Sequence, residues 1–244
     1  EMRFLANRVS DIFSSPLGTY RNGYIRSGNH KFISFSMLLP YSLAIYANEK
    51  LLKIVDSYCG SISHLSNHRI YQNLCQTRFL TKPMKWHKDN KLDYINNQGN
   101  HITTMVQDDK GLILILYLSD TTKGGTQFKL DTHSYCNDTE CFEDKSISQF
   151  QTYTANNLPI GTGLLYDYRM IHRAQPTYSR HQQRISLFAQ YSPSYMPNGE
   201  PIHIESSVVK SLSDRQRKLF NIDSEDTMPT APNWPIDASH EGYF

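Results

Sequence analysis

Short runs of apolar or alternating residues, separated by polar turns, recur through the middle of the chain. They occupy residues 69–80, 112–120, 150–155, 164–172 and 184–192. Each run has about the length of a β-strand, and turn-forming residue types separate the runs. The pattern predicts a mainly β fold, a sandwich or barrel with helices on the outside.

Two other segments show helical spacing. In residues 40–60, PYSLAIYANEKLLKIVDSYCG, apolar side chains recur every three or four positions, and the pattern stops at Gly60. This spacing predicts one amphipathic helix with a glycine at its end. The sequence DRQRKLF, which follows Ser213, predicts a short helix before a Pro-rich, acidic end.

The segments 112–120 and 121–130 predict a hairpin in the core. LILILYLSD is continuously apolar, like a buried strand, and TTKGGTQFKL supplies a turn and a returning strand. Before them, residues 93–111 are rich in Asn, Asp and Gly, which predicts a mobile surface loop. Such a loop beside a site can act as a lid.

The length of 244 residues fits one large domain with appended segments. We divide the chain into an N-terminal helical and extended segment at 1–66, a β core at 67–195 and a C-terminal extension at 196–244. The 25 Lys and Arg residues nearly balance the 23 Asp and Glu residues, which leaves a formal charge of +2. This balance argues against nucleic acid or an anionic membrane as the main partner.

The longest apolar runs fall far short of the roughly 20 residues that span a bilayer, and no N-terminal targeting pattern is visible. The four cysteines have neither the density of a disulfide scaffold nor the paired spacing of a zinc finger. We therefore expect a soluble, cytoplasmic protein with reduced thiols. The sequence leaves its oligomeric state open.

The stretch MKWHKDN follows the predicted strand at 69–80 and places an imidazole two residues before a carboxylate. His87 and Asp89 point to the same side of an extended segment, which suggests two metal ligands. The third candidate is His172, which ends the apolar run LLYDYRMIH, whereas most other histidines lie in polar context. Taken alone, such a histidine is more often a hydrogen-bonded structural residue than a ligand.

Two histidines and a carboxylate leave three positions open on a metal, as in non-haem Fe(II) oxygenases. A chelating co-substrate can take two of these positions and dioxygen the third. Asp89 favours hydroxylation-type chemistry, because an Ala or Gly in its place would make room for a halide.

On the last predicted strand, Arg184 and Ser186 face the same side. A guanidinium and a hydroxyl together suit the distal carboxylate of a dicarboxylate such as 2-oxoglutarate. The alternative is an ordinary surface salt bridge of Arg184.

Three motifs carry a resemblance to a known family: WHKDN, ILILYLSDTTKGGTQF and LPIGTGLLYDYRMIHRAQPTYSRHQQRISLFAQY. They resemble the Fe(II)/2-oxoglutarate-dependent dioxygenase superfamily, most nearly its prolyl-hydroxylase-like and phytanoyl-CoA-hydroxylase-like branches, over about half of the chain. The resemblance implies a double-stranded β-helix, or jelly roll, with flanking helices. It makes His87, Asp89 and His172 the catalytic iron ligands, and it makes Arg184, Ser186 and Tyr117 residues that bind 2-oxoglutarate.

The chain departs from the patterns of these branches at two points. Arg184 lies farther beyond His172 than the corresponding arginine of the nearest prolyl hydroxylases, so Arg180 is a rival for binding 2-oxoglutarate. The turn GGTQF is one residue shorter than the usual Gly-Gly-x-Thr-x-Phe. Tyr117 can equally be a buried aromatic residue of a strand.

The sequence therefore predicts an Fe(II)/2-oxoglutarate-dependent oxygenase that uses O2 to oxidise an unactivated C–H bond of a small molecule, with succinate and CO2 as co-products. One alternative is a hydroxylase of peptide or protein side chains. Another is a catalytically inactive jelly-roll binding module. Hydroxylation, desaturation and ring closure need the same ligands, so the outcome at the substrate is left open.

Overall fold

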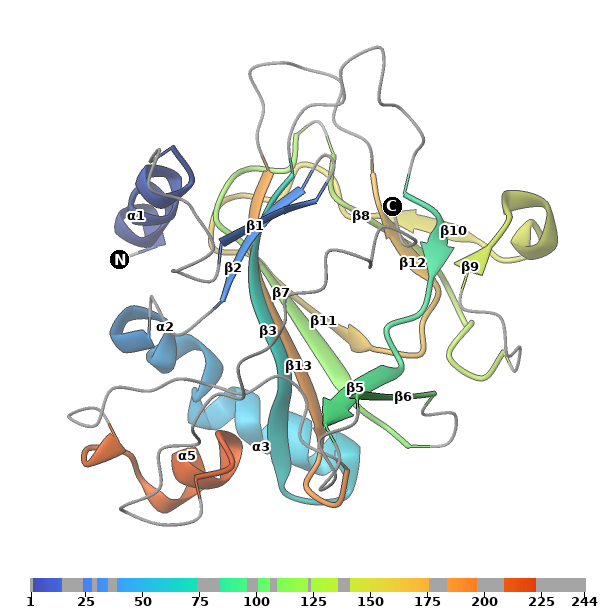
Figure 1. Cartoon of the computed structure of the whole chain (residues 1–244). Helices are drawn as coiled ribbons and strands as arrows, with labels where there is room; N and C mark the ends of the chain where they lie inside the picture. Colours follow the sequence, from blue (N-terminus) through green and yellow to red (C-terminus); the bar gives the residue numbers. More distant parts are fainter. Residues whose placement is uncertain are drawn as a thin grey trace.

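The computed structural model contains two larger antiparallel β-sheets, and the helices lie outside one of them (Figure 1). The arrangement is a mainly β jelly roll with flanking helices, which confirms the predicted fold class. The structure describes residues 2–14, 24–27, 30–34, 39–73, 84–95, 101–105, 109–122, 124–135, 141–175, 184–196 and 209–222.

The larger sheet has six strands in the order β1-β2-β3-β13-β7-β11, and each strand is antiparallel to its neighbours. Its long central strands extend the length of the molecule (Figure 1). The strands are β1 (Tyr24–Ser27), β2 (His30–Ser34), β3 (Ser63–Asn73), β13 (Arg184–Pro193), β7 (Leu112–Tyr117) and β11 (Gly163–Asp167).

The smaller sheet has five short strands in the order β10-β8-β12-β4-β9. A 3-10 helix, η3 (Asp144–Ile147), follows β9 along the chain. The strands are β10 (Thr152–Thr154), β8 (Thr126–Lys129), β12 (His172–Ala174), β4 (Trp86–His87) and β9 (Cys141–Phe142). Because β12 pairs with β4, the sheet places His172 directly opposite His87.

The hairpin predicted for residues 112–120 and 121–130 is wrong. Strand β7 pairs with β11 and β13, whereas β8 belongs to the smaller sheet and pairs with β10 and β12. Between them the chain passes from one sheet to the other. A turn signal marks the end of a strand, but long-range packing decides which strand becomes its neighbour.

The helices lie on the outer side of the six-stranded sheet (Figure 1). Their apolar side chains and those of β3, β7 and β13 form the larger core cluster, in which Val55 and Leu187 are fully buried. This core fixes the sheet whose inner face carries part of the site. The helices are α1 (Met2–Ser14), α2 (Leu39–Tyr46), α3 (Glu49–Cys59) and α5 (Asp214–Leu219).

The single helix predicted at 40–60 is in fact two, α2 and α3. The Asn48 side chain accepts hydrogen bonds from the backbone N–H groups of Lys50 and Leu51, at 3.1 and 3.2 Å, and so starts α3 afresh. The predicted glycine end is confirmed, because Gly60 has φ of 70° in the left-handed region. The short helix predicted after Ser213 is also confirmed, as α5.

The strand predicted at 164–172 is divided. Strand β11 ends at Asp167, and a turn closed by a 2.9 Å hydrogen bond from Met170 N to Asp167 O leads into β12. His172 therefore begins a strand instead of ending one. The division allows the chain to leave the six-stranded sheet and enter the five-stranded one.

The loop predicted at 93–111 contains regular structure. Strands β5 (Lys91–Ile95) and β6 (His101–Met105) pair antiparallel, so alternating and β-branched residues outweigh the Asn and Gly content here. Residues 96–100 lie outside the described part of the chain. The role of this segment as a lid stays a prediction.

The three-segment division of the chain also stays a prediction, and strand β3 runs across its boundary at residue 66. The residues before that boundary supply β1 and β2 to the larger sheet. None of the described helices is long and apolar enough to cross a membrane.

Candidate metal centre

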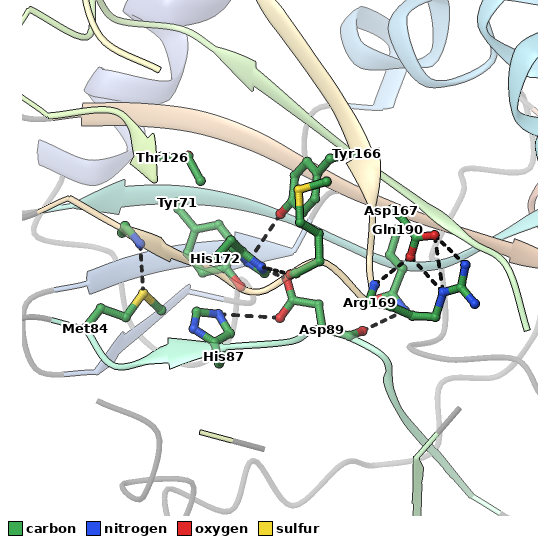
Figure 2. Close-up of polar contacts among 12 residues, drawn as sticks. Tyr71, Met84, His87, Asp89, Thr126, Tyr166, Asp167, Arg169, His172 and Gln190 are labelled. Carbon is green, nitrogen blue, oxygen red and sulfur yellow. Dashed lines mark hydrogen bonds and ion pairs between the residues drawn. The ribbon is translucent and has the colours of Figure 1, made fainter. Parts of the chain in front are cut away.

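The three predicted metal ligands come together between the sheets. His87 and His172 lie on paired strands of the smaller sheet, and Asp89 follows His87 just beyond the end of β4 (Figure 2). Asp89 Oδ1 lies 3.6 Å from His87 Nε2, and Asp89 Oδ2 lies 3.1 Å from His172 Nε2. All three ligand atoms lie within 4.8 Å of one another. In the described part of the chain, no other group of His, Cys, Asp and Glu residues has a geometry suited to a metal ion.

Backbone carbonyls set the orientation of both imidazole rings. His87 Nδ1 lies 2.9 Å from Lys85 O, and His172 Nδ1 lies 3.0 Å from Met170 O. A carbonyl only accepts, so Nδ1 carries a proton in each ring, and Nε2 is the nitrogen that faces Asp89 and is left to bind a metal ion. This is the tautomer that a metal ligand needs.

The electrostatics of the triad also favour a cation. Burial alone would raise the pKa of Asp89, but the charge and hydrogen bond of His172, with smaller contributions from His87 and Arg69, lower it. Burial opposes protonation of His172, but Asp89 outweighs it and raises the pKa of the imidazole. Asp89 is therefore held as a carboxylate that attracts positive charge. Two imidazole nitrogens and one carboxylate fit a divalent iron with open positions.

Hydrogen bonds of the backbone hold Asp89 in place. Asp89 N donates to Tyr168 O at 2.9 Å, which ties it to the turn that leads into His172. On the other side, Gln190 Nε2 donates to Asp89 O at 3.3 Å. The backbone of Asp89 is thus connected to the turn after β11 and to β13, so its position is set by the fold and not by a free loop.

The sequence matches no family model and no curated protein, so the relationships come from structure. One similar structure is EctD from S. alaskensis with 2-oxoglutarate and 5-hydroxyectoine, at a TM-score of 0.62 and 14% identity over 82% of this chain and 70% of that chain. Another is the epimerase SnoN in complex with Fe3+, alpha ketoglutarate and nogalamycin RO, at a TM-score of 0.56 and 14% identity over 78% of this chain and 72% of that one.

A third is HygX from Streptomyces hygroscopicus with nickel, 2-oxoglutarate and hygromycin B, at a TM-score of 0.54 and 10% identity over 81% of this chain and 80% of that one. These neighbours have metal or 2-oxoglutarate bound, and this chain resembles them over most of its length. The chain has the 2-oxoglutarate-oxygenase fold. The resemblance seen in the sequence motifs is therefore confirmed at the level of the fold.

Within the 2-oxoglutarate-oxygenase fold of this chain, the predicted co-substrate residues gather at one end of β13. Arg184 is buried, and its Nη1 donates to Gly124 O at 3.0 Å and to Gly125 O at 2.8 Å. Ser186 lies on the same face and pairs with Tyr117 of β7. Burial lowers the pKa of Arg184, while Tyr117 opposes that effect.

Tyr117 is fully buried, as expected of an aromatic residue on a strand, yet its hydroxyl makes hydrogen bonds to the neighbouring sheet. It lies 2.8 Å from Thr126 Oγ1 and accepts a 3.1 Å hydrogen bond from Thr126 N. Tyr117 and Thr126 thus link the two sheets beside Arg184. Arg180, the rival of Arg184, lies outside the described residues.

Further polar residues of the interior were missed by the sequence analysis. Arg69 pairs with Phe188, so on β3 it shares a face with Tyr71, whose ring meets Phe188 edge-on at 5.8 Å. Arg69 Nη1 donates to Tyr71 Oη at 3.4 Å. Tyr166 reaches His172 from β11 (Figure 2). Strand alternation, applied to 69–80 as it was to 184–192, would have placed Arg69 and Tyr71 on one face.

A second polar cluster supports the turn that carries His172. The carboxylate of Asp167 accepts two hydrogen bonds from Arg169 Nε, at 3.0 and 3.2 Å, and one from Arg169 Nη2 at 2.7 Å (Figure 2). It also accepts one from the hydroxyl of Tyr58 on α3. Burial alone would raise the pKa of Asp167, but Arg169 and Tyr58 outweigh it and lower the pKa. The cluster joins helix α3 to the end of β11.

We predict that Asp167→Ala lowers the free energy of unfolding by roughly 3–5 kcal/mol, because it leaves the buried charge of Arg169 without its partner. Denaturant unfolding at neutral pH measures the change. Because folding lowers the pKa of Asp167, this stabilisation is fully present at pH values above the ordinary pKa of an aspartate. The stabilisation should be lost as the pH falls through the pKa of Asp167 in the folded protein.

Asp120→Ala is the matched control for this prediction. Like Asp167, Asp120 accepts hydrogen bonds from the residue two positions further on, since its Oδ1 accepts from Thr122 N and from Thr122 Oγ1. Unlike Asp167, Asp120 is exposed. Its replacement should cost less than about 1 kcal/mol. Equal losses for the two variants would contradict a special role of Asp167.

Proposed function

We propose that this protein is an Fe(II)/2-oxoglutarate-dependent oxygenase that oxidises an unactivated C–H bond of a small molecule. The observation that carries the proposal is the convergence of His87, Asp89 and His172, with both Nε2 atoms directed at the carboxylate. When bound, iron and 2-oxoglutarate supply the oxidation by dioxygen, with succinate and CO2 as co-products. The chain itself binds, orients and shields these reactants.

In the proposed site, His87, Asp89 and His172 hold the ion on one side and leave its other side open. Arg184 binds the distal carboxylate of 2-oxoglutarate, with Ser186 as an additional hydrogen-bond donor on the same face. Tyr117 lies in the same corner and contacts the co-substrate. The aromatic residues Phe128, Tyr166 and Phe188, which pack in one cluster, exclude water from the interior.

Small molecules are the favoured substrates. The structures of SnoN, HygX and EctD contain nogalamycin RO, hygromycin B and 5-hydroxyectoine, which supports this class. Hydroxylation of a peptide or protein side chain is the alternative within the same chemistry. An inactive binding module is disfavoured, because such a module has no need of three ligands with set tautomers.

The direct test of the proposed function needs no substrate. Anaerobic addition of Fe(II) and then 2-oxoglutarate should produce a weak visible charge-transfer band. Admission of O2 should then yield succinate slowly through uncoupled turnover. Zn(II) in place of Fe(II) is the control and should give neither signal, since Zn(II) is redox-inactive. A protein that binds Fe(II) but shows neither the band nor succinate would contradict the proposal.

A further inference from the structure

Tyr166 is a buried tyrosine whose ring is fixed beside the candidate metal ligands. It points from β11 of the larger sheet into the interior, where its ring meets Phe128 edge-on at 4.9 Å and His172 edge-on at 5.1 Å (Figure 2). Its side chain also belongs to the cluster formed by Ile113 and Phe188. With two rings packed against it, Tyr166 has little freedom to move its hydroxyl elsewhere.

The hydroxyl of Tyr166 is aimed at the ligand atom of His172. Tyr166 Oη lies 3.3 Å from His172 Nε2, and in the described part of the chain this is its one hydrogen-bond partner. Nδ1 of His172 donates to Met170 O, so the atom that Tyr166 Oη faces is the ligand nitrogen Nε2, which also lies 3.1 Å from Asp89 Oδ2. A tyrosine hydroxyl carries its proton at neutral pH and can therefore donate a hydrogen bond.

A metal ion held by the triad would occupy the Nε2 lone pair of His172. The hydroxyl of Tyr166 would then have no acceptor at this atom. A buried O–H group without an acceptor is unfavourable. Asp89 directs its two carboxylate oxygens at His87 and His172, so it is already engaged as a ligand and an ion-pair partner.

We infer that Tyr166 donates its hydrogen bond to 2-oxoglutarate, at an oxygen with which the keto acid chelates the ion beside His172. This assignment rests on the proposed function. It makes Tyr166 a co-substrate-binding residue at the chelating end of 2-oxoglutarate, whereas Arg184 is proposed for the distal end. A hydrogen bond to the keto acid lowers the energy of its acceptor orbital, and the charge-transfer band should therefore lie at longer wavelength than it would without Tyr166.

The test compares Tyr166→Phe with the wild-type protein, each loaded anaerobically with Fe(II) and titrated with 2-oxoglutarate. The variant should show the band at shorter wavelength and bind 2-oxoglutarate about three- to tenfold more weakly, as expected for one lost hydrogen bond. Tyr168→Phe is the matched control. Tyr168 is also buried and lies two residues further on, but its hydroxyl donates to Asp109 O at 2.8 Å. The charge-transfer band of Tyr168→Phe should therefore match that of the wild type.

The outcomes separate this inference from the proposed function. A band that forms in the wild type and stays unchanged in position and affinity in Tyr166→Phe overturns the role of Tyr166 alone. If no band forms even in the wild type, the proposed function fails and the inference fails with it. Circular dichroism should confirm that Tyr166→Phe is folded. If Tyr166→Phe does not fold, Tyr166→Leu, which lacks the same hydroxyl, takes the place of Tyr166→Phe in the comparison.

Discussion

Replacing His87 with alanine should weaken Fe(II) binding by more than about a hundredfold and abolish formation of succinate from 2-oxoglutarate. Loss of a residue that merely orients a ligand typically costs ten- to a hundredfold in metal affinity, and loss of the ligand itself should cost more. Asp89→Ala should weaken Fe(II) binding and abolish succinate formation in the same way, because it removes the negative charge that attracts the ion. The side chains of His87 and Asp89 are 17% and 24% exposed, so both variants should fold.

Anaerobic calorimetric titration with Fe(II) measures these affinities. His133→Ala is the control, because His133 is exposed and lies outside the triad, and it should bind Fe(II) as the wild type does. His172→Ala should lose binding too, but it carries a stability cost, since His172 is buried and packs against Tyr166 and Phe128. A folded variant with unchanged Fe(II) affinity would remove that residue from the ligand set.

Replacing Arg184 with alanine should raise the apparent constant for 2-oxoglutarate by at least about tenfold. A buried hydrogen bond between charged groups is worth roughly 1.5–3 kcal/mol, and about 1.4 kcal/mol corresponds to a factor of ten. Arg180→Ala should change the constant by less than about threefold, as for the exposed charge that the sequence predicts at this position. Titration of 2-oxoglutarate in the succinate assay measures both values.

Arg184 also has a structural task that this comparison must separate. Its Nη1 donates to the carbonyls of Gly124 and Gly125, so Arg184→Ala should lower stability as well. Arg184→Lys keeps the charge but loses the planar fork, and it should bind 2-oxoglutarate more weakly than the wild type while retaining more stability than the alanine variant. A larger defect in Arg180→Ala than in Arg184→Ala would assign the co-substrate carboxylate to Arg180.

The grouping of His87, Asp89 and His172 could be predicted from the sequence because few residue types bind iron and because His87 and Asp89 are close in the chain. His172 was harder to predict as a third member of this group, because the strand that pairs with its own is distant in sequence. The pairing of β12 with β4 that brings it opposite His87 arises only in the folded chain. The resemblance to a known family supplied that long-range information, which hydrophobic patterns do not contain.

The errors have a common physical origin. At 112–130 the sequence predicted a strand, a turn and a strand, and these elements exist, but β7 and β8 lie in different sheets. At Asn48 a capping residue interrupts an otherwise continuous helical pattern. Tyr166 was overlooked because a tyrosine in an apolar run is normally a core residue, and only the position of His172 gives its hydroxyl a role.

The pairing of His87 with His172 and the bond from Asp89 N to Tyr168 O have a thermodynamic consequence for iron loading. Strand pairing and packed side chains set the ligand spacing, so the chain does not need to fold around the ion to form the site. In small zinc domains, by contrast, metal affinity is itself folding free energy. Iron should therefore act here as an ordinary ligand by mass action, raising the melting temperature gradually with the logarithm of its free concentration.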